Sequence, residues 1–233
     1  MKRIAIIAAI PGELVPLVRG WRHEARYGIH LWRSNSGEDE WIAACAGMGQ
    51  TAATRAFAEI EKDGPVASAV SVGWAGALSE EYKPGCAYAV SGVIDVRTGE
   101  RFQTTSGTAA TPALPWLVTS PVVAGFDEKQ RLAGAYRAGL VDMEAAAIAR
   151  LAAMRGIPFA CIKGVSDGFG ARLPDFNRFF SPSGHFRLAR FVLFAILQPW
   201  WWPSLVRMGE NSSKASQAIR ESLRDYLHRP GAN

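Results

Sequence analysis

The chain of 233 residues lacks the features that mark several large classes of protein. Its three cysteines, Cys45, Cys86 and Cys161, are odd in number and far apart, and two lie in apolar runs, so we expect reduced, buried thiols instead of disulfides or a metal site. No apolar run reaches the roughly 20 residues that span a membrane. The net charge of +5 comes with no long basic run, so little indicates a nucleic-acid partner. These absences favour a cytoplasmic protein, and we expect no metal or cofactor.

The first residues also lack a complete secretory signal, although two basic residues precede an apolar run. The run from Ile4 to Ile10 is short and ends at Pro11 and Gly12. Glu13 follows, where a signal peptide would carry small residues and a cleavage site. The start of the chain therefore predicts a first β-strand and a turn that presents Glu13.

Strand-like apolar runs alternate with helix-like segments, and no internal repeat is present. The alternation predicts a single α/β domain over residues 1–233, a three-layer α/β/α sandwich around a mixed central sheet. An irregular loop is expected over residues 101–115. We predict strands near 4–9, 31–33, 41–45, 66–72, 86–96, 117–118 and 159–165, and helices after Gly49, over 127–136 and 144–155, and from 213 onward.

Two acidic residues flank the Ala-rich segment 144–155 and the apolar strand behind it. Glu144 opens the predicted helix, and Asp167 follows the strand directly after Ser166. We expect both acids at one edge of the sheet, beyond the strand ends, where ligands bind in open α/β folds. The alternative for Glu144 is that it only complements the positive end of its helix.

A glycine turn keeps a nicotinamide-dependent oxidoreductase open as a rival from another class. Gly47, Gly49 and Ala52 match the spacing of a dinucleotide-binding turn. However, the turn follows the third strand-like segment instead of the first, and Glu61 and Asp63 fall short of the acidic position about 20 residues on. The simpler interpretation is that the glycines allow a sharp turn and Ala52 lets the helix pack closely.

The C-terminal segment, about 184–228, is Trp-rich and then helical. Trp200, Trp201 and Trp202 lie between two prolines and cannot all face one core, so at least one is exposed or lines a groove. Trp favours membrane interfaces, and the alternatives are the protein's own core or a contact in the homodimer that we expect. From Ser213 onward the pattern predicts an amphipathic packing helix.

Together these pieces resemble the superfamily of purine nucleoside phosphorylases and methylthioadenosine/S-adenosylhomocysteine nucleosidases over most of the chain. The Met-Glu pair that opens the Ala-rich helix, and the Ser-Asp pair about twenty residues later, carry the likeness most specifically. The resemblance implies cleavage of the N-glycosidic bond of a small-molecule nucleoside. The matching segments are IAIIAAIPGEL (4–14), AGMGQTAA (46–53), SVGWAGAL (71–78), VDMEAAAIA (141–149) and GVSDG (164–168).

This reaction builds an oxocarbenium-like ribosyl cation, and adenine leaves as an anion unless it is protonated, so the site needs an acid beside the base. The resemblance assigns Asp167 to protonate adenine N7. Asp167 must then be neutral or share a proton near neutral pH, which requires burial. Ser166 is expected to hold Asp167 in position, although a serine at a strand end can also cap the next turn.

The resemblance assigns three further residues to the sugar and the nucleophile. Glu144 would stay ionised and accept hydrogen bonds from the ribose 2′- and 3′-hydroxyls, and Met143 would pack on the apolar face of the sugar. Glu13 would activate water. Met143 filling the core, and Glu13 as a solvated turn residue, remain alternatives.

The residues around Glu13 and in the glycine-containing segment 71–78 favour water over phosphate as the nucleophile. Bacterial phosphorylases of this superfamily supply arginine and hydroxyl groups there, whereas this chain has no arginine beside Glu13 and carries Ser71 and Trp74 at the other matching places. Trp74 and Gly76 are expected at the substrate, in a reshaped pocket. Phe126 is the candidate for stacking on adenine.

The block FVLFAILQPWWWPSLVRMGENSSKA resembles the hopanoid-associated phosphorylase branch of the superfamily. That resemblance implies adenosylhopane, a lipid-linked nucleoside, as substrate, with Trp200, Trp201 and Trp202 at the inner face of the cytoplasmic membrane. The alternatives are a phosphate-dependent purine nucleoside phosphorylase, a methylthioadenosine/S-adenosylhomocysteine nucleosidase, and an inactive membrane-peripheral nucleoside-binding protein. The last is disfavoured because all four predicted polar site residues are present, namely Glu13, Glu144, Ser166 and Asp167.

Overall fold

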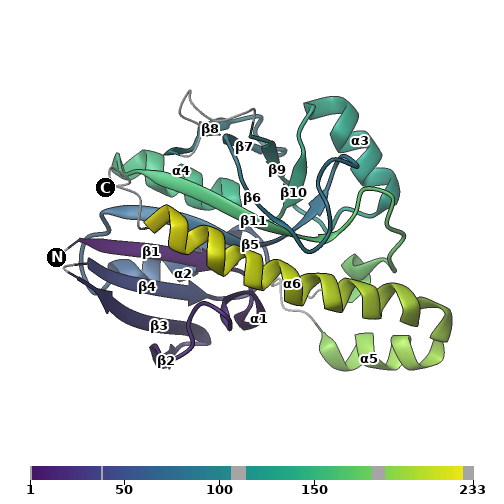
Figure 1. Cartoon of the computed structure of the whole chain (residues 1–233), viewed down its shortest axis with the longest axis horizontal. Coiled ribbons are helices and arrows are strands. Elements are labelled where there is room, and N and C mark those ends of the chain that lie inside the picture. Colours follow the sequence, from purple (N-terminus) through teal and green to yellow (C-terminus); the bar gives the residue numbers. More distant parts are fainter. Residues whose placement is uncertain (1, 38, 106–113, 180–186, 228–233) are drawn as a thin grey trace.

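The computed structural model describes residues 2–37, 39–105, 114–179 and 187–227, which form a mixed β-sheet with helices on both faces (Figure 1). The strands are β1 (Arg3–Ala8), β2 (Arg22–Arg26), β3 (Ile29–Ser36), β4 (Asp39–Cys45), β5 (Ser68–Ala77), β6 (Ala87–Ala89), β7 (Gly92–Asp95), β8 (Arg101–Gln103), β9 (Trp116–Thr119), β10 (Leu140–Asp142) and β11 (Phe159–Asp167). The helices are α1 (Pro11–Leu14), α2 (Gln50–Glu61), α3 (Phe126–Tyr136), α4 (Ala145–Arg155), α5 (Leu188–Leu197) and α6 (Trp202–Leu227), with 3₁₀ turns η2 (Phe176–Phe179) and η3 (Pro199–Trp201).

The three layers follow from the alternation of side chains along the central strands. In β1, Ala5 and Ile7 join the core beneath α2 and α4, while Ile4 and Ile6 join the core beneath α1 and α6. Every one of these side chains is buried, as expected for a sheet covered on both faces. The predicted three-layer α/β/α fold is therefore confirmed.

Helix α4 owes its position to small side chains and a defined end. Its alanines are almost all buried against β5 and α2, which brings the helix close to the sheet. Gly156 ends it in the left-handed conformation, φ 62°, which glycine adopts without steric cost. The helix start, and hence Glu144, is thereby held at a fixed place above the sheet.

The site lies where two strands part along one edge of β5. Strand β11 pairs with β5 from Ala69 to Gly76, so β1, which pairs at Ser68–Ser71, and β10, which pairs at Gly76 and Ala77, share the opposite edge. The β5 residues 72–75 between them have neither strand beside them on that edge. This fork opens the sheet at its centre, and the loops after β1, β10 and β11 meet around it.

Several local predictions need correction. The single strand expected over 86–96 is two strands, β6 and β7, which pair with different partners. The short strands β2, β8 and β10 were missed, and β8 forms the start of the segment 101–115 that was expected to be an irregular loop. Helix α6 begins at Trp202, well before Ser213. Cys45 and Cys161 are buried free thiols as expected, but Cys86 is exposed beside the edge strand β6. Parts of the expected loop (106–113) and C-terminal segment (184–186 and 228) lie outside the described residues.

No helix in the described part of the chain is both long and apolar enough to cross a membrane.

Candidate active site

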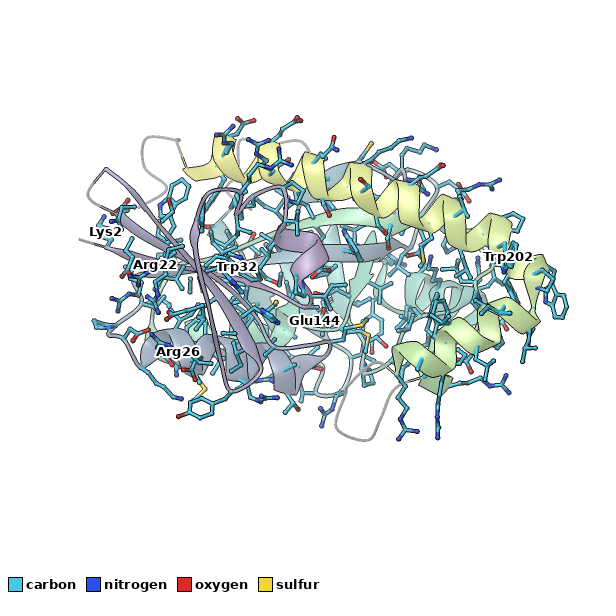
Figure 2. The ribbon with its side chains drawn as sticks, turned by 90° about the horizontal axis from the view of Figure 1, so that it is seen from below. Lys2, Arg22, Arg26, Trp32, Glu144 and Trp202 are labelled. Atoms are coloured by element: carbon cyan, nitrogen blue, oxygen red, sulfur yellow. The ribbon has the colours of Figure 1, made fainter. Side chains whose placement is uncertain are left out.

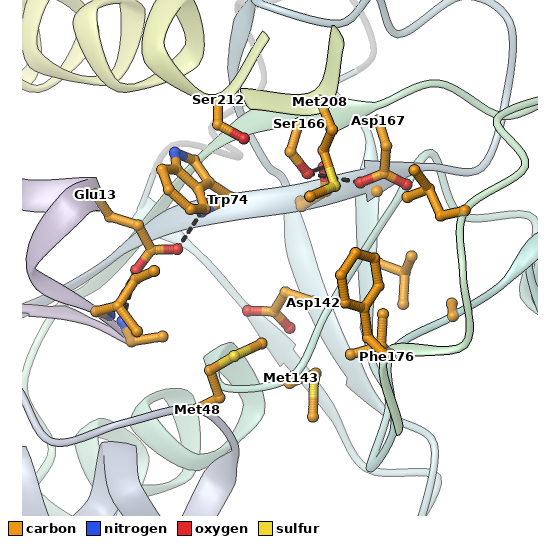
Figure 3. Close-up of a pocket in the computed structure, with 18 of the residues that line it drawn as sticks. Glu13, Met48, Trp74, Asp142, Met143, Ser166, Asp167, Phe176, Met208 and Ser212 are labelled. Atoms are coloured by element: carbon orange, nitrogen blue, oxygen red, sulfur yellow. Dashed lines mark hydrogen bonds between the residues drawn. The ribbon is translucent and has the colours of Figure 1, made fainter. Parts of the chain in front are cut away.

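A cavity of about 410 Å³ occupies the fork between β1 and β10. Four acidic residues line it from different elements: Glu13 from α1, Asp142 from the end of β10, Glu144 from the start of α4 and Asp167 from the end of β11. Figure 3 shows Glu13 and Asp167 on opposite sides of the cavity, with Trp74 and Ser166 along the strands between them. Most of the remaining lining is apolar and comes from the loops after β9 and β11 and from α5 and α6.

Glu13 is buried, and backbone N–H groups hold both of its carboxylate oxygens. Oε2 accepts hydrogen bonds from the N–H groups of Ala9 (2.8 Å) and Ile10 (3.0 Å), and Oε1 accepts one from Trp74 N–H in the fork (2.7 Å). A Cβ on Gly73 would lie 2.8 Å from Oε1, so only glycine leaves room for this arrangement. Burial raises the pKa of Glu13 above its ordinary value, although the three N–H groups and Lys163 oppose the rise.

Glu144 points away from its own helix and into the cavity. Its Oε1 accepts a hydrogen bond from Gly49 N–H (2.6 Å) at the start of α2. The first N–H groups of α4 bind elsewhere, Ala145 N–H to Asp142 Oδ2 (2.9 Å) and Ala146 N–H to Thr119 Oγ1 (3.0 Å). Because other side chains cap the helix, its dipole does not explain Glu144.

A buried ion pair lies beside Glu144. Lys163 Nζ, from the middle of β11, is 2.9 Å from Asp142 Oδ2, and both side chains are fully buried. Burial and the nearby Asp142 carboxylate raise the pKa of Glu144 to about 8, against the attraction of Lys163. This shift favours the protonated form of Glu144, whereas the resemblance implies an ionised carboxylate.

Asp167 is held by a hydroxyl and an ammonium group. Ser166 Oγ donates to Asp167 Oδ1 (2.6 Å), and the buried Lys129 from α3 forms an ion pair with Oδ2. Lys129 Nζ also donates to the carbonyl of Gly168 (2.7 Å). The pairing of β11 with β5 is irregular between Val165 and Asp167, a bulge that turns the carboxylate toward the cavity. The sequence analysis expects a buried Asp167 that is neutral or shares a proton, whereas the structure places the Lys129 ammonium against it.

Gly76 of β5 lies between β10 on one edge and β11 on the other. It lies opposite Val141 of β10 and Asp167 of β11. A Cβ on Gly76 would lie 3.0 Å from Lys129 Cε and 3.3 Å from Asp167 Oδ2. A larger residue at this position would therefore press on the Lys129–Asp167 ion pair.

Trp74 joins the cavity to helix α6. Its ring lines the cavity beside Glu13, and its Nε1 donates a hydrogen bond to Ser216 Oγ in α6 (2.9 Å). The ring also packs over the α1 turn, 3.5 Å from where a Cβ on Gly12 would lie. Substitutions in α6 can therefore move a wall of the cavity.

Comparison with known proteins supplies the family. The family model of the phosphorylase superfamily matches residues 3–126 and 116–193. The chain belongs to the phosphorylase superfamily. No curated protein sequence matches it.

Solved structures of superfamily members share the fold at low sequence identity. A 5′-methylthioadenosine/S-adenosylhomocysteine nucleosidase from Helicobacter pylori is 14% identical with a TM-score of 0.72, and 97% of each chain is covered. The futalosine hydrolase of the same organism is 14% identical with a TM-score of 0.70, covering 96% of each chain. An S-adenosylhomocysteine nucleosidase from Streptococcus pyogenes is 16% identical with a TM-score of 0.72, covering 97% of this chain and 96% of the other.

Most of the predicted site residues meet at the cavity of this superfamily member. The lining includes Glu13, Trp74, Gly76, Met143, Glu144, Ser166 and Asp167. Phe126 is not part of it, because its ring lies at the start of α3 under the guanidinium of Arg172 (4.8 Å). Phe176, from the turn after β11, lines the cavity instead and is the better candidate for stacking on a base. Ser71 is buried within β5 and is not part of the lining.

Sequence reasoning missed the two buried lysines and the methionine Met48. Lys163 had a visible signal, because a single lysine in the apolar run FACIKGV can be buried only with a partner. Lys129 had none, because it lies among charged residues of an ordinary surface helix pattern. Met48, in the first glycine turn, lines the cavity together with Met143. The N–H of Gly49 in that turn binds Glu144, so it does not serve a dinucleotide phosphate.

Proposed function

We propose that the protein hydrolyses the N-glycosidic bond of adenosine-type nucleosides and releases adenine. The observation that carries the proposal is the convergence of Glu13, Glu144 and Asp167 on one largely apolar cavity, each held by fixed hydrogen-bond donors. A cavity with acidic groups on several sides is complementary to a ribosyl group that becomes cationic in the transition state. The solved structures with the same fold include nucleosidases and a hydrolase.

Asp167 protonates the leaving base in this mechanism. In the free protein Asp167 is the carboxylate of the Lys129 ion pair, so it takes up a proton from solvent when the substrate binds and passes that proton to adenine N7 while the bond between C1′ and N9 breaks. The ammonium of Lys129 and the hydroxyl of Ser166 then stabilise the carboxylate that remains. Because both partners are already in place, this stabilisation needs no rearrangement during the reaction.

Glu13 activates the nucleophile. It removes a proton from a water molecule whose oxygen bonds to C1′ as adenine departs, so ribose gains a hydroxyl. The raised pKa of the buried Glu13 makes its carboxylate a stronger base than an exposed glutamate, which suits this step. The three backbone N–H groups fix the direction of the carboxylate.

Glu144 holds the sugar. In its protonated state it can donate one hydrogen bond and accept another, which matches a ribose 2′,3′-diol. Met143 and Met48 provide apolar surface beside it.

Water is favoured over phosphate because of the charges around the cavity. Among the described residues that line it, none is an arginine or a lysine, and the two nearby lysines are paired with Asp142 and Asp167. A phosphate dianion would meet Glu13 without a cation to compensate.

The test follows adenine release from methylthioadenosine by chromatography, with and without phosphate, for the wild type and Glu13→Gln. We expect release without phosphate, and a loss of about 10² to 10⁴ in Glu13→Gln that phosphate does not restore. Glu81→Gln, an exposed glutamate, is the matched control. Strict dependence on phosphate would overturn the hydrolytic reaction, and full activity of Glu13→Gln would overturn the role of Glu13.

The 5′ substituent of the substrate is proposed to be apolar, with adenosylhopane as the expected case. The support is the part of the lining that comes from α5, α6 and the loop before them, which includes Phe176, Phe191, Leu205 and Met208. Assaying adenosylhopane, methylthioadenosine, S-adenosylhomocysteine and inosine side by side tests this specificity. Preference for the polar S-adenosylhomocysteine would overturn it.

A further inference from the structure

Helix α5 and the first part of α6 form a hairpin, residues 187–209, that projects beyond the sheet (Figure 1). Most amphipathic helices of globular proteins turn their apolar side inward, but α5 is apolar on its outer side too. Leu193 is 58% exposed, Ile196 61% and Leu197 66%. These positions follow helical spacing, so they form one continuous outer stripe.

The turn of the hairpin extends this apolar surface. Trp200 is 67% exposed and Trp202 52%, which confirms that the three tryptophans do not share one core. Trp202 Nε1 donates a hydrogen bond to Ala195 O (2.7 Å), so the turn is tied back to α5. Figure 2 shows Trp202 at the tip of the hairpin, at the opposite end of the molecule from Lys2. We call the exposed apolar side chains of this hairpin the tip surface, namely Val192, Leu193, Ile196, Leu197, Trp200, Trp202 and Val206.

The inner side of the same hairpin lines the cavity. Phe191 of α5 and Leu205 and Met208 of α6 face the site, and Phe191 also packs on Phe176 with ring centroids 5.5 Å apart. The hairpin is therefore a thin wall with the reaction cavity on one side and the tip surface on the other.

The charges of the hairpin indicate which kind of partner would bind the tip surface. Residues 187–209 contain Arg187, Arg190 and Arg207 and no aspartate or glutamate. Arginines around exposed tryptophan and leucine side chains match a bilayer with anionic headgroups. A second copy fits less well, because a two-fold contact through this surface would bring the same arginines together.

We propose that the tip surface docks on a membrane containing anionic phospholipid, with its apolar side chains in the headgroup region and its arginines against phosphate. Docking places the wall of the cavity at the lipid, so an apolar 5′ substituent can enter from the bilayer. This second step rests on the proposed function, whereas the docking itself does not.

The experiment is vesicle flotation of the full chain, using phosphatidylcholine alone and phosphatidylcholine mixed with phosphatidylglycerol. We expect the wild type to float with the mixed vesicles, and less so as salt is raised. The double variant Leu193→Glu/Ile196→Glu is expected to bind at least about tenfold more weakly, because it puts two carboxylates among lipid chains. Met154→Glu, which changes a 75% exposed methionine on α4, is the matched control and is expected to float like the wild type.

A second pair of variants separates charge from hydrophobic insertion. Arg190→Gln/Arg207→Gln is expected to lose the preference for anionic vesicles while its residual binding no longer depends on salt. The docking proposal is overturned if the wild type does not float, or if Leu193→Glu/Ile196→Glu floats equally well. It is also overturned if the wild type is a dimer that this double variant converts to monomers, with no vesicle binding by either.

Measuring adenine release from methylthioadenosine in solution distinguishes failure of the docking proposal from failure of the proposed function. None of the four substituted hairpin residues lines the cavity, so both double variants are expected to keep this activity. Loss of flotation with full activity is the expected combination. Wild-type flotation without any activity would reject the proposed function and leave the docking standing.

Discussion

The cavity buries carboxylates, whereas the α5–α6 hairpin exposes hydrophobic side chains. In the cavity each acid has fixed donors, such as Trp74 N–H for Glu13 and Gly49 N–H for Glu144. At the tip surface the exposed side chains of Leu193 and Ile196 are apolar, so no hydrogen bonds fix them in this way. Both arrangements cost stability, the first through desolvation of charge and the second through contact of apolar surface with water.

The buried acids of the cavity and the exposed hydrophobic side chains of the hairpin indicate two different kinds of function. Buried acids that are individually held indicate chemistry, because their positions are fixed more tightly than folding needs. Exposed hydrophobic residues that are not held indicate a surface whose partner lies outside the chain. Helix α6 contains both situations, since Val206 is exposed at its start while Ile219 and Leu223 are buried against the sheet near its end.

The largest effect is expected in the cavity, at Asp167. Asp167→Asn keeps the shape and the contact with Ser166 but has no carboxyl proton to give. The rate of adenine release should fall by about 10² to 10⁴ in a variant that still folds, although loss of the Lys129 ion pair should lower its unfolding midpoint. Asp127→Asn, at an exposed position on α3, is the control. Near-normal turnover in Asp167→Asn would show that another group protonates the base.

The second largest effect is expected when Lys129 is substituted. Lys129→Met removes the ammonium from Asp167 while filling similar space, and kcat should fall by about tenfold to hundredfold. The KM for methylthioadenosine should change much less, because Lys129 is not among the residues that line the cavity. The exposed Lys83→Met should change neither kcat nor KM. Loss of the folded state in Lys129→Met, measured by urea denaturation, would reduce Lys129 to a structural role.

The pH dependence of the free energy of unfolding tests the cost of burying the charge of Glu144. Its folded pKa of about 8 lies above the ordinary value of 4.5, so the folded state holds the proton more tightly. This group therefore costs no stability below pH 4.5, and its penalty grows as pH rises from 4.5 to about 8. Glu144→Gln removes the penalty, so relative to the wild type it should gain roughly 2 kcal/mol or more between pH 5 and pH 8. Urea denaturation at both values measures the gain, and an unchanged difference would contradict the raised pKa.

Local motifs predicted part of the site because they reflect local chemistry. Glu144 and Asp167 are recognisable from their neighbours along the chain, and each reaches the cavity as expected. Their meeting depends on the fork in the sheet, which follows from the missed strand β10 and could not be read from the apolar pattern. Lys129 is buried only because α3 packs beside the end of β11. Phe176 lines the cavity and Phe126 does not, because the chain after β11 folds back over the cavity.

The smallest effect is expected at the tip surface. It is measured by comparing an exposed isoleucine of α5 with a buried isoleucine of α6. Ile196→Glu changes an exposed side chain, so the free energy of unfolding should stay within about 0.5 kcal/mol of the wild type. Ile219→Glu introduces the same charge where the side chain is buried beside Gly164, and should cost several kcal/mol or prevent folding. Urea denaturation of both variants in the absence of lipid makes the comparison. If Ile196→Glu were as destabilising as Ile219→Glu, the outer side of α5 would be part of the core, and the distinction between held and unheld surfaces would fail.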